Sequence, residues 1–199
     1  MATIKSFKHA VDGTVYEVGD SVVVHPQAGD EPYVGKIQSI ELRGRRHKIH
    51  VLWYYRPEET AGGRKMFHGK YELFTSNHED EIDEATIRSK AFVFPLDQYM
   101  SLAEANPRCF FTRVHYCPSS KRFTPKEQEH YCLCRHPYNP DYPMIQCDVC
   151  DEWYHTECLG ISEADCVDNF VAHGHPTTTQ AKRPRTDLEQ HSLFWQQTH

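Results

Sequence analysis

The sequence predicts a mainly β (α+β) protein, in which a β-barrel-like domain is followed by a small zinc-bound module. Three observations support this prediction. Short β-branched and aromatic runs recur up to about residue 116, cysteine and histidine gather from residue 132 onward, and a polar, proline-interrupted stretch separates the two regions. With 199 residues, 39% of them hydrophobic and 12% aromatic, the chain can supply one core of ordinary size and a smaller one.

The first region contains three clear strand candidates, at residues 22–24, 33–37 and 47–55. Gly19 and Asp20 form a turn signal before the first of them, and residues 43–46 (RGRR) are typical of a polar hairpin tip. Short strands at such intervals favour a compact, mostly antiparallel barrel or sandwich.

One helix and one further strand are expected before the first region ends. Residues 97–106 (DQYMSLAEAN) predict a short helix ended by Pro107, and residues 110–114 (FFTRV) return to strand character. The polar segment that follows is typical of a connector, and the chain end has too few apolar groups for a core. The predicted organisation is an N-terminal arm at 1–11, a β domain at 12–117, a linker at 118–129, a zinc module at 130–175 and a disordered tail at 176–199.

Six potential zinc ligands follow one another as C-x-C, C-x-x-C and H-x-x-C. They are Cys132, Cys134, Cys147, Cys150, His155 and Cys158. Thiolates and imidazoles suit the tetrahedral shell of Zn²⁺, and closely spaced pairs let a short loop place two ligands. Six ligands exceed one four-coordinate site. The simplest interpretation is two interleaved sites, in which the first and third pairs share one ion and the middle pair begins a second.

Composition and charge narrow the functional classes. No apolar signal segment begins at Met1 and no stretch approaches the ~20 apolar residues of a membrane span, so we expect a reducing compartment and no membrane partner. A net charge of −6 argues against nonspecific nucleic-acid binding and favours a basic partner, for which the acidic run at 79–84 is a candidate surface. The fourteen histidines form no hydrolase constellation, and no phosphate-binding loop appears. The basic cluster at 182–185 (KRPR) could act in nuclear import.

The order of ligand types and one aromatic segment resemble known domains. A histidine in fifth place, after four cysteines, resembles a PHD finger, whereas a RING domain has its histidine fourth. Residues 53–60 (WYYRPEET), with 67–74 (FHGKYELF) downstream, resemble a BAH domain. BAH followed by PHD resembles the small plant chromatin readers of the EARLY BOLTING IN SHORT DAYS and SHORT LIFE type, over about residues 12–171.

The resemblance implies a methyl-lysine cage in the BAH half. Trimethyl-lysine has no N–H donor, so aromatic faces hold it best, at about 0.5–2 kcal/mol per contact. Trp53 and Tyr55 would project to one side of a strand and Tyr54 to the other, although packing in the core remains the alternative. By similarity the site for histone H3 trimethylated at lysine 27 comprises Tyr33, Trp53, Tyr55, His78 and Asp80. One departure is that the family's SDHFD is SNHED here, at residues 76–80.

A second cage is implied in the PHD half, for H3 di- or trimethylated at lysine 4. Its members by similarity are Tyr131, Tyr138, Met144 and Trp153. Zinc ligation at the neighbouring His155 would hold the indole of Trp153 rigidly, and the acidic residues Asp141, Asp148, Asp151 and Glu152 could pair with the amine and arginine at the start of the H3 tail. The alternative is that the two tyrosines only shield the zinc sites.

The chain departs from the family after Cys158. Family members close the second zinc site with C-x-x-C, but residues 170–175 read FVAHGH. Ala172 takes the first position and cannot ligate; His175 takes the second and can, with His173 or Cys166 as further candidates. We therefore expect one Zn²⁺ at Cys132, Cys134, His155 and Cys158, and leave open a second at Cys147, Cys150 and His175.

The expected function is that of a non-enzymatic chromatin reader in the nucleus. It would bind methylated histone H3 tails in transcriptional repression, with repressor-complex proteins as further partners and without direct sequence-specific nucleic-acid recognition. Two alternatives stay open. One is a protein-interaction scaffold based on the BAH domain, with a degenerate finger. The other is a RING-like ubiquitin ligase, which the place of His155 in the ligand order disfavours.

Overall fold

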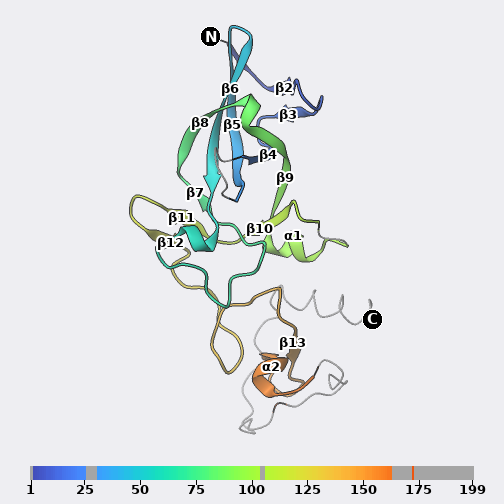
Figure 1. The fold of residues 1–199 in the computed structure, drawn as a ribbon. Coiled ribbons are helices and arrows are strands. Elements are labelled where there is room, and N and C mark those ends of the chain that lie inside the picture. Colours follow the sequence, from blue (N-terminus) through green and yellow to red (C-terminus); the bar gives the residue numbers. More distant parts are fainter. Residues whose placement is uncertain (1, 26–30, 104–105, 163–171, 173–199) are drawn as a thin grey trace. The chain divides into compact units, whose positions relative to one another are not determined.

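The computed structural model describes residues 2–25, 31–103, 106–162 and 172. Two compact units are present (Figure 1). The first unit comprises Met1–Lys65 and Tyr71–Lys126, and the second comprises Met66–Lys70 and Glu127–His199. No helix in the described part of the chain is long and apolar enough to cross a membrane.

The first unit is built on a seven-stranded sheet with the order β10-β9-β4-β5-β6-β8, and β1 pairs with β5 beside this path. The strands are β1 (Ala2–Ile4), β4 (Ser21–Val24), β5 (Tyr33–Arg43), β6 (Arg46–Tyr54), β8 (Glu79–Asp83), β9 (Ile87–Pro95) and β10 (Cys109–Thr112). All pairs are antiparallel except β10 with β9. The long β5–β6 hairpin runs through the middle of this sheet (Figure 1).

The turns around this hairpin follow the sequence signals. Arg43 pairs with Arg46, which leaves a two-residue connection, and Gly44 within it adopts φ 68°. Such positive φ values suit the tight hairpin turns whose twist matches that of the strands. Gly19, with φ 99°, likewise turns the chain into β4. The predicted strands and the predicted hairpin tip are confirmed.

Smaller elements surround the sheet. They are β2 (Ser6–Lys8) paired with β3 (Val15–Glu17), the three-stranded set β12 (Arg122–Thr124), β11 (His115–Cys117) and β7 (Thr75–Ser76), and the short helices η1 (Pro57–Glu59), η2 (Glu84–Thr86) and α1 (Leu96–Met100). The segment predicted as a linker at 118–129 therefore contains β12. Its Phe123 provides the physical reason, because this ring packs against Phe74 and Tyr116.

The helix predicted at 97–106 is shorter than expected. It begins at Leu96 and ends at Met100. The backbone N–H of Ser101 donates to the carbonyl of Gln98, three residues back, and the Ser101 hydroxyl donates to the Asp97 carbonyl. The side chain thus takes the acceptor that the next helical turn would need, which ends the helix.

The core of the first unit lies on the inner face of the sheet. Its main cluster consists of Phe7, Tyr16, Val22, Val24, Ile37, Ile40, Ile49, Val51 and Ile87. Two smaller clusters lie around Leu73 and Phe74. Glu72, directly before them in the sequence, is buried and is paired with Arg113, whose Nε lies 2.9 Å from its carboxylate.

The second unit has little regular structure. It contains the two-stranded sheet of β13 (Met144–Gln146) and β14 (Trp153–His155), then helix α2 (Thr156–Leu159), which ends at Gly160 in the left-handed conformation. Among its described residues, the buried apolar cluster consists of Cys147, Tyr154 and Ala172, with three partly buried neighbours. The predicted ligand His175, the candidates Cys166 and His173, the tail at 176–199 and its basic cluster lie outside the described residues.

Candidate functional site

The strand register places the predicted BAH-side residues on one face. Gly35 lies opposite Trp53 in the antiparallel β5–β6 pair, and Val51 lies opposite Asp80 in the β6–β8 pair. Opposite residues share a face and alternate residues return to it, so the same face continues one step beyond each pair. The residues on this face include Tyr33, Gly35, Val51, Trp53, Tyr55, His78 and Asp80, of which Val51 is buried in the core. Tyr54 faces the other way and packs with Val34.

Gly35 makes room for the indole of Trp53. A Cβ at residue 35 would lie only 3.2 and 3.3 Å from two indole carbons and 3.3 Å from the Cβ of Val51. Trp53 packs against the main core cluster, and the ring of Tyr33 lies edge-on to it at 5.8 Å between centroids. Tyr33 itself is 38% exposed. Trp53 therefore contacts both the core and the exposed ring of Tyr33, and its place in a cage stays a prediction.

Hydrogen bonds hold the third aromatic and the histidine. The phenol oxygen of Tyr55 lies 2.7 Å from Nδ1 of His78. The backbone N–H of Trp53 donates to the carbonyl of His78, and the Ser76 hydroxyl donates to the carbonyl of Trp53. Burial raises the pKa of the Tyr55 phenol, helped by the nearby carboxylate of Glu59. Tyr55 therefore stays a neutral hydrogen-bonding group at physiological pH.

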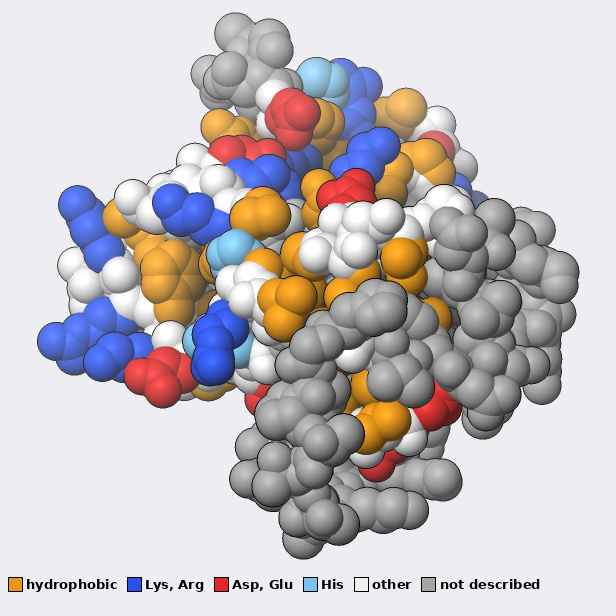
Figure 2. Space-filling view, turned by 90° about the horizontal axis from the view of Figure 1, so that it is seen from below, with side chains coloured by type: hydrophobic (Ala, Val, Ile, Leu, Met, Phe, Trp, Pro, Cys, Tyr) orange, Lys and Arg blue, Asp and Glu red, His pale blue; other side chains and the backbone are white. Residues whose placement is uncertain are grey.

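Several carboxylates of the predicted acidic surface are paired with basic side chains of the first unit. Glu81 accepts from Arg43 at 2.8 Å, and Asp83 lies 3.2 Å from the ammonium of Lys48. The carboxylate of Glu84 lies 2.6 Å from Nδ1 of His47. The residues nearest the aromatic face, Glu79 and Asp80, are exposed. On the face shown in Figure 2, described Lys and Arg side chains are interspersed with acidic and hydrophobic ones, so no continuous basic patch forms there.

Four of the predicted zinc ligands converge in the second unit. The ligand atoms of Cys132, Cys134, His155 and Cys158 all lie within 4.8 Å of one another. Nδ1 of His155 is 3.5 Å from the sulfur of Cys134 and 3.9 Å from that of Cys158. A tetrahedral Zn²⁺ at ordinary bond lengths separates sulfur and nitrogen ligands by about 3.5 Å. The donor set and its spacing therefore fit a structural zinc ion.

The electrostatics of this group also fit a cation. Burial tends to raise the pKa of the Cys132 thiol, but backbone N–H groups of Cys134 and His155 outweigh it and the net shift is downward. Burial and the facing Cys132 sulfur raise the pKa of Cys158 to about 12. Burial lowers the pKa of His155, which keeps the imidazole neutral and able to ligate. A divalent cation removes the mutual repulsion of such thiolates and lets them all lose their protons.

The second predicted metal site is incomplete among the described residues. Cys147 is fully buried and Cys150 is partly buried beside it. Ala172 packs in the same cluster, 5% exposed, and its backbone hydrogen-bonds to the Cys147 thiol. Residue 172 therefore lies beside the Cys147 thiol but has a side chain that cannot bind zinc.

The two-stranded sheet of the second unit carries two of the residues predicted for the PHD-side cage. Met144 pairs with His155 and Gln146 pairs with Trp153, so Met144 and Trp153 lie on the same face of the two-stranded sheet. Tyr131 forms a bridge to His136 and donates its hydroxyl to Glu129. Tyr138 is half-buried. The place of both tyrosines in a cage stays a prediction.

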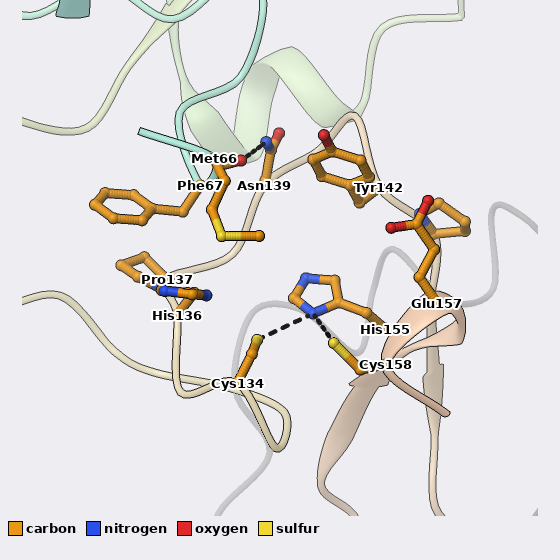
Figure 3. A pocket seen from close by; sticks show the side chains of 11 residues that line it. Met66, Phe67, Cys134, His136, Pro137, Asn139, Tyr142, His155, Glu157 and Cys158 are labelled. Carbon is orange, nitrogen blue, oxygen red and sulfur yellow. Dashed lines mark hydrogen bonds between the residues drawn. The ribbon is translucent and has the colours of Figure 1, made fainter. Parts of the chain in front are cut away.

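A cavity of about 70 Å³ opens beside the first metal group, not at the predicted cage (Figure 3). Met66 and Phe67 line it together with the ligand His155. The amide of Asn139 donates to the Met66 carbonyl at 2.8 Å, and Phe67 stacks on His136. Sequence reasoning missed these residues, since nothing local marks residues 66–70 as part of the second unit. It also missed Gly35, although a glycine inside a strand run is a signal of close packing.

Comparisons with known proteins agree with this architecture. The BAH domain family matches residues 14–127, and the PHD-finger family matches residues 132–169. The chain is 41% identical to Chromatin remodeling protein EBS of Arabidopsis thaliana over 169 residues, which cover 82% of this chain and 72% of that protein. It is 39% identical to Chromatin remodeling protein SHL of the same plant over 172 residues, covering 84% and 75%.

More distant matches cover single domains. Lysine-specific demethylase 7A of Mus musculus is 46% identical over 43 residues, which are 22% of this chain and 5% of the demethylase. The crystal structure of the yeast Rsc2 BAH domain aligns with a TM-score of 0.50 and 21% identity, covering 62% of this chain and 54% of that one, and supports the fold alone. The long matches to two plant proteins, together with both domain families, show that this chain belongs to the family of BAH-domain proteins that also carry a PHD finger.

Proposed function

We propose that this protein is a nuclear chromatin reader acting in transcriptional repression. Its BAH domain binds histone H3 trimethylated at lysine 27, and its PHD finger binds H3 di- or trimethylated at lysine 4. The similarity to two plant proteins named as chromatin remodeling proteins supports the chromatin role. The demethylase match covers only 43 residues, so it supports a shared finger and no shared reaction.

One observation carries the BAH proposal, namely the common face of Tyr33, Trp53 and Tyr55. Aromatic faces attract a cation that offers no proton, and their apolar surfaces accept its methyl groups. The indole of Trp53 packs against the core, and the ring of Tyr33 beside it is exposed. A rigid, half-open aromatic group of this kind loses little conformational entropy when a ligand enters.

The neighbouring polar residues suit the backbone of an extended tail. His78 and Asp80 continue the aromatic face onto β8, which lies at the end of the strand order. A sheet edge can pair with an extended peptide through main-chain hydrogen bonds. The exposed carboxylate of Asp80 adds a negative charge that suits the basic H3 sequence.

The finger proposal is supported by the first metal group and by the shared face of Met144 and Trp153. Zinc at Cys132, Cys134, His155 and Cys158 would hold β14 and therefore the indole of Trp153. The bound ion is structural and closes its tetrahedral shell with protein ligands. Tyr131 and Tyr138 complete the proposed cage.

A second candidate function is a BAH-based protein-interaction scaffold with a degenerate finger. The position of Ala172 beside the Cys147 thiol favours it, because the second metal site then lacks a thiolate ligand. A finger with one ion is less rigid and holds its reading residues less firmly. Such a protein binds its partners without distinguishing methylated from unmodified H3.

Titration of H3 peptides onto the intact chain, with zinc content measured on the same sample, tests both functions. The reader predicts tighter binding of the lysine 27 trimethyl peptide than of the unmodified one, with the preference lost in Trp53→Ala. Tyr54→Phe is the control, since Tyr54 faces away and its hydroxyl lies within hydrogen-bond distance of the Ser21 hydroxyl. Equal affinity of the wild type for both peptides contradicts the reader and supports the scaffold.

The two halves serve as controls for each other. Trp153→Ala is expected to lose the preference for the lysine 4 methyl peptide and to keep that for the lysine 27 peptide, and Trp53→Ala is expected to do the reverse. Loss of both preferences in either variant, with an unchanged melting temperature, contradicts the assignment of one mark to each domain.

A further inference from the structure

Arg56 ties together the chain segments that carry two walls of the aromatic face. It directly follows Tyr55, and the β5–β6 register, continued two steps past the pair of Val34 with Tyr54, places it opposite Pro32. Its Nη2 donates to the Pro32 carbonyl at 2.8 Å, and its Nε lies 3.2 Å from the carboxylate of Glu31.

The guanidinium is held in place from several sides. Its side chain is only 15% exposed. The backbone N–H of Arg56 donates to the Glu59 carboxylate at 2.5 Å, which fixes the turn that follows β6. An arginine with both its backbone and its head group bonded has few alternative conformations, so the position of the guanidinium is well defined.

The acceptor on the other strand lies immediately before Tyr33. Pro32 has no N–H to offer, and its ring fixes φ, while Glu31 before it is restricted to extended conformations. The carbonyl of Pro32 therefore anchors the chain directly before Tyr33, whose own backbone pairs with Val24 of β4. The bond from Arg56 sets where the chain enters β5 and hence where the Tyr33 ring stands.

We propose that Arg56 is a positioning residue that holds Tyr33 against Trp53, in the orientation that binds methyl-lysine. The recognition part rests on the proposed function, whereas the positioning of Tyr33 does not. Tyr33 needs such support because it is 38% exposed, and among the described residues its ring contact is the edge-on approach to Trp53. Without the bond from Arg56, the Tyr33 segment becomes ordered only when the ligand binds. The entropy cost of that ordering weakens the binding.

The planar fork of arginine suits this task better than lysine. Two of its nitrogens reach two different acceptors at fixed angles, which a single ammonium cannot reproduce. The ion pair with Glu31 contributes less, since that carboxylate is 78% exposed and screened by solvent. The bond to the Pro32 carbonyl is therefore the contact on which the positioning depends.

Peptide titration with variants of the full chain tests the recognition part. Arg56→Gln is expected to weaken binding of the lysine 27 trimethyl peptide about threefold to tenfold, the cost of immobilising one side chain. Arg56→Lys should fall between it and the wild type, and Glu31→Gln should stay close to the wild type. In the double variant with Tyr33→Ala, Arg56→Gln should add no further loss, because the two residues act as one unit. Additive losses, or an Arg56→Gln variant as tight as the wild type, overturn the proposal.

Amide hydrogen exchange of the free protein tests the positioning part without any ligand. Arg56→Gln should accelerate exchange at Tyr33 and Val34 while the melting temperature and the exchange of β9 stay as in the wild type. Unchanged protection at Tyr33 and Val34 overturns the positioning role. If the wild type shows no preference for methylated peptide, the proposed function fails, and the exchange result still decides the role of Arg56.

Discussion

The two units of this protein are stabilised by different means. The first buries Tyr16, Phe74 and Phe111 almost completely within a broad apolar core. The second has one small cluster around Cys147 and Tyr154, and its clearest organising feature is a group of four metal-ligand atoms. Small modules with little core commonly depend on a bound metal for folding. The residues proposed for recognition would therefore be held by packed side chains in the first unit and by metal ligands in the second.

Zinc removal should produce the largest difference in stability between the two units. Structural zinc contributes about 10–16 kcal/mol of apparent free energy to small metal-dependent folds. A chelator is therefore expected to abolish amide protection in β13, β14 and α2 and to leave that of β5 and β6 intact, as measured by hydrogen exchange. Restored protection after zinc is added back is the control. Protection of β14 that survives complete zinc removal would contradict a metal-dependent finger.

Ala172→Cys should test the difference between the complete and the incomplete metal site of the second unit. The new thiol would lie beside Cys147 and add a ligand to the incomplete site, so we expect zinc content to rise from one ion per chain to two. Elemental analysis of the purified protein measures this directly. Ala85→Cys adds a thiol at an exposed position of η2 in the first unit and should leave the zinc content unchanged. Two ions already present in the wild type would show that other residues complete the site.

Gly35→Ala should disturb the first unit locally. The added methyl would press on the indole of Trp53 and on Val51, and overpacking of this kind costs about 1–3 kcal/mol. We expect a lower melting temperature and a weaker preference for the trimethylated lysine 27 peptide, with zinc content unchanged. Gly62→Ala is the matched control, because a Cβ there meets nothing within 4 Å. Equal effects of the two substitutions would argue against the packing role of Gly35.

Asp12→Asn should give the smallest effect, visible as a change in acid stability. The backbone N–H of Thr14, followed by His9, lowers the pKa of the Asp12 carboxyl from 3.8 to about 2. Because this pKa is depressed in the folded protein, the stabilising contribution is complete above the ordinary value and is lost as the pH falls toward 2. Urea unfolding at several pH values should show a steeper loss of stability between these limits in the wild type than in the variant. Parallel curves would contradict the prediction.

The sequence alone predicted the features that depend on residues close together in the chain. The strands of the first region, the hairpin tip at residues 43–46 and the turn at Gly19 follow from local conformational preferences, and the structure confirms them. The first metal group was predictable because two short ligand pairs carry their own geometry. The alternation of Trp53, Tyr54 and Tyr55 was predictable for the same reason, since a strand repeats every two residues.

Only the tertiary structure decided how distant segments meet. The β5–β6 and β6–β8 registers put Tyr33, Trp53 and His78 on one face, and they also oppose Gly35 to the indole and Arg56 to Pro32. The pairing of β5, β6 and β8 places part of the acidic run in ion pairs with Arg43 and Lys48. In a separate sheet, the pairing of β11 with β12 brings Phe123 of the expected linker against Tyr116. Residues 66–70 joined the second unit through Asn139. Such contacts depend on chain closure over tens of residues, and no local preference encodes which partner a side chain will find there.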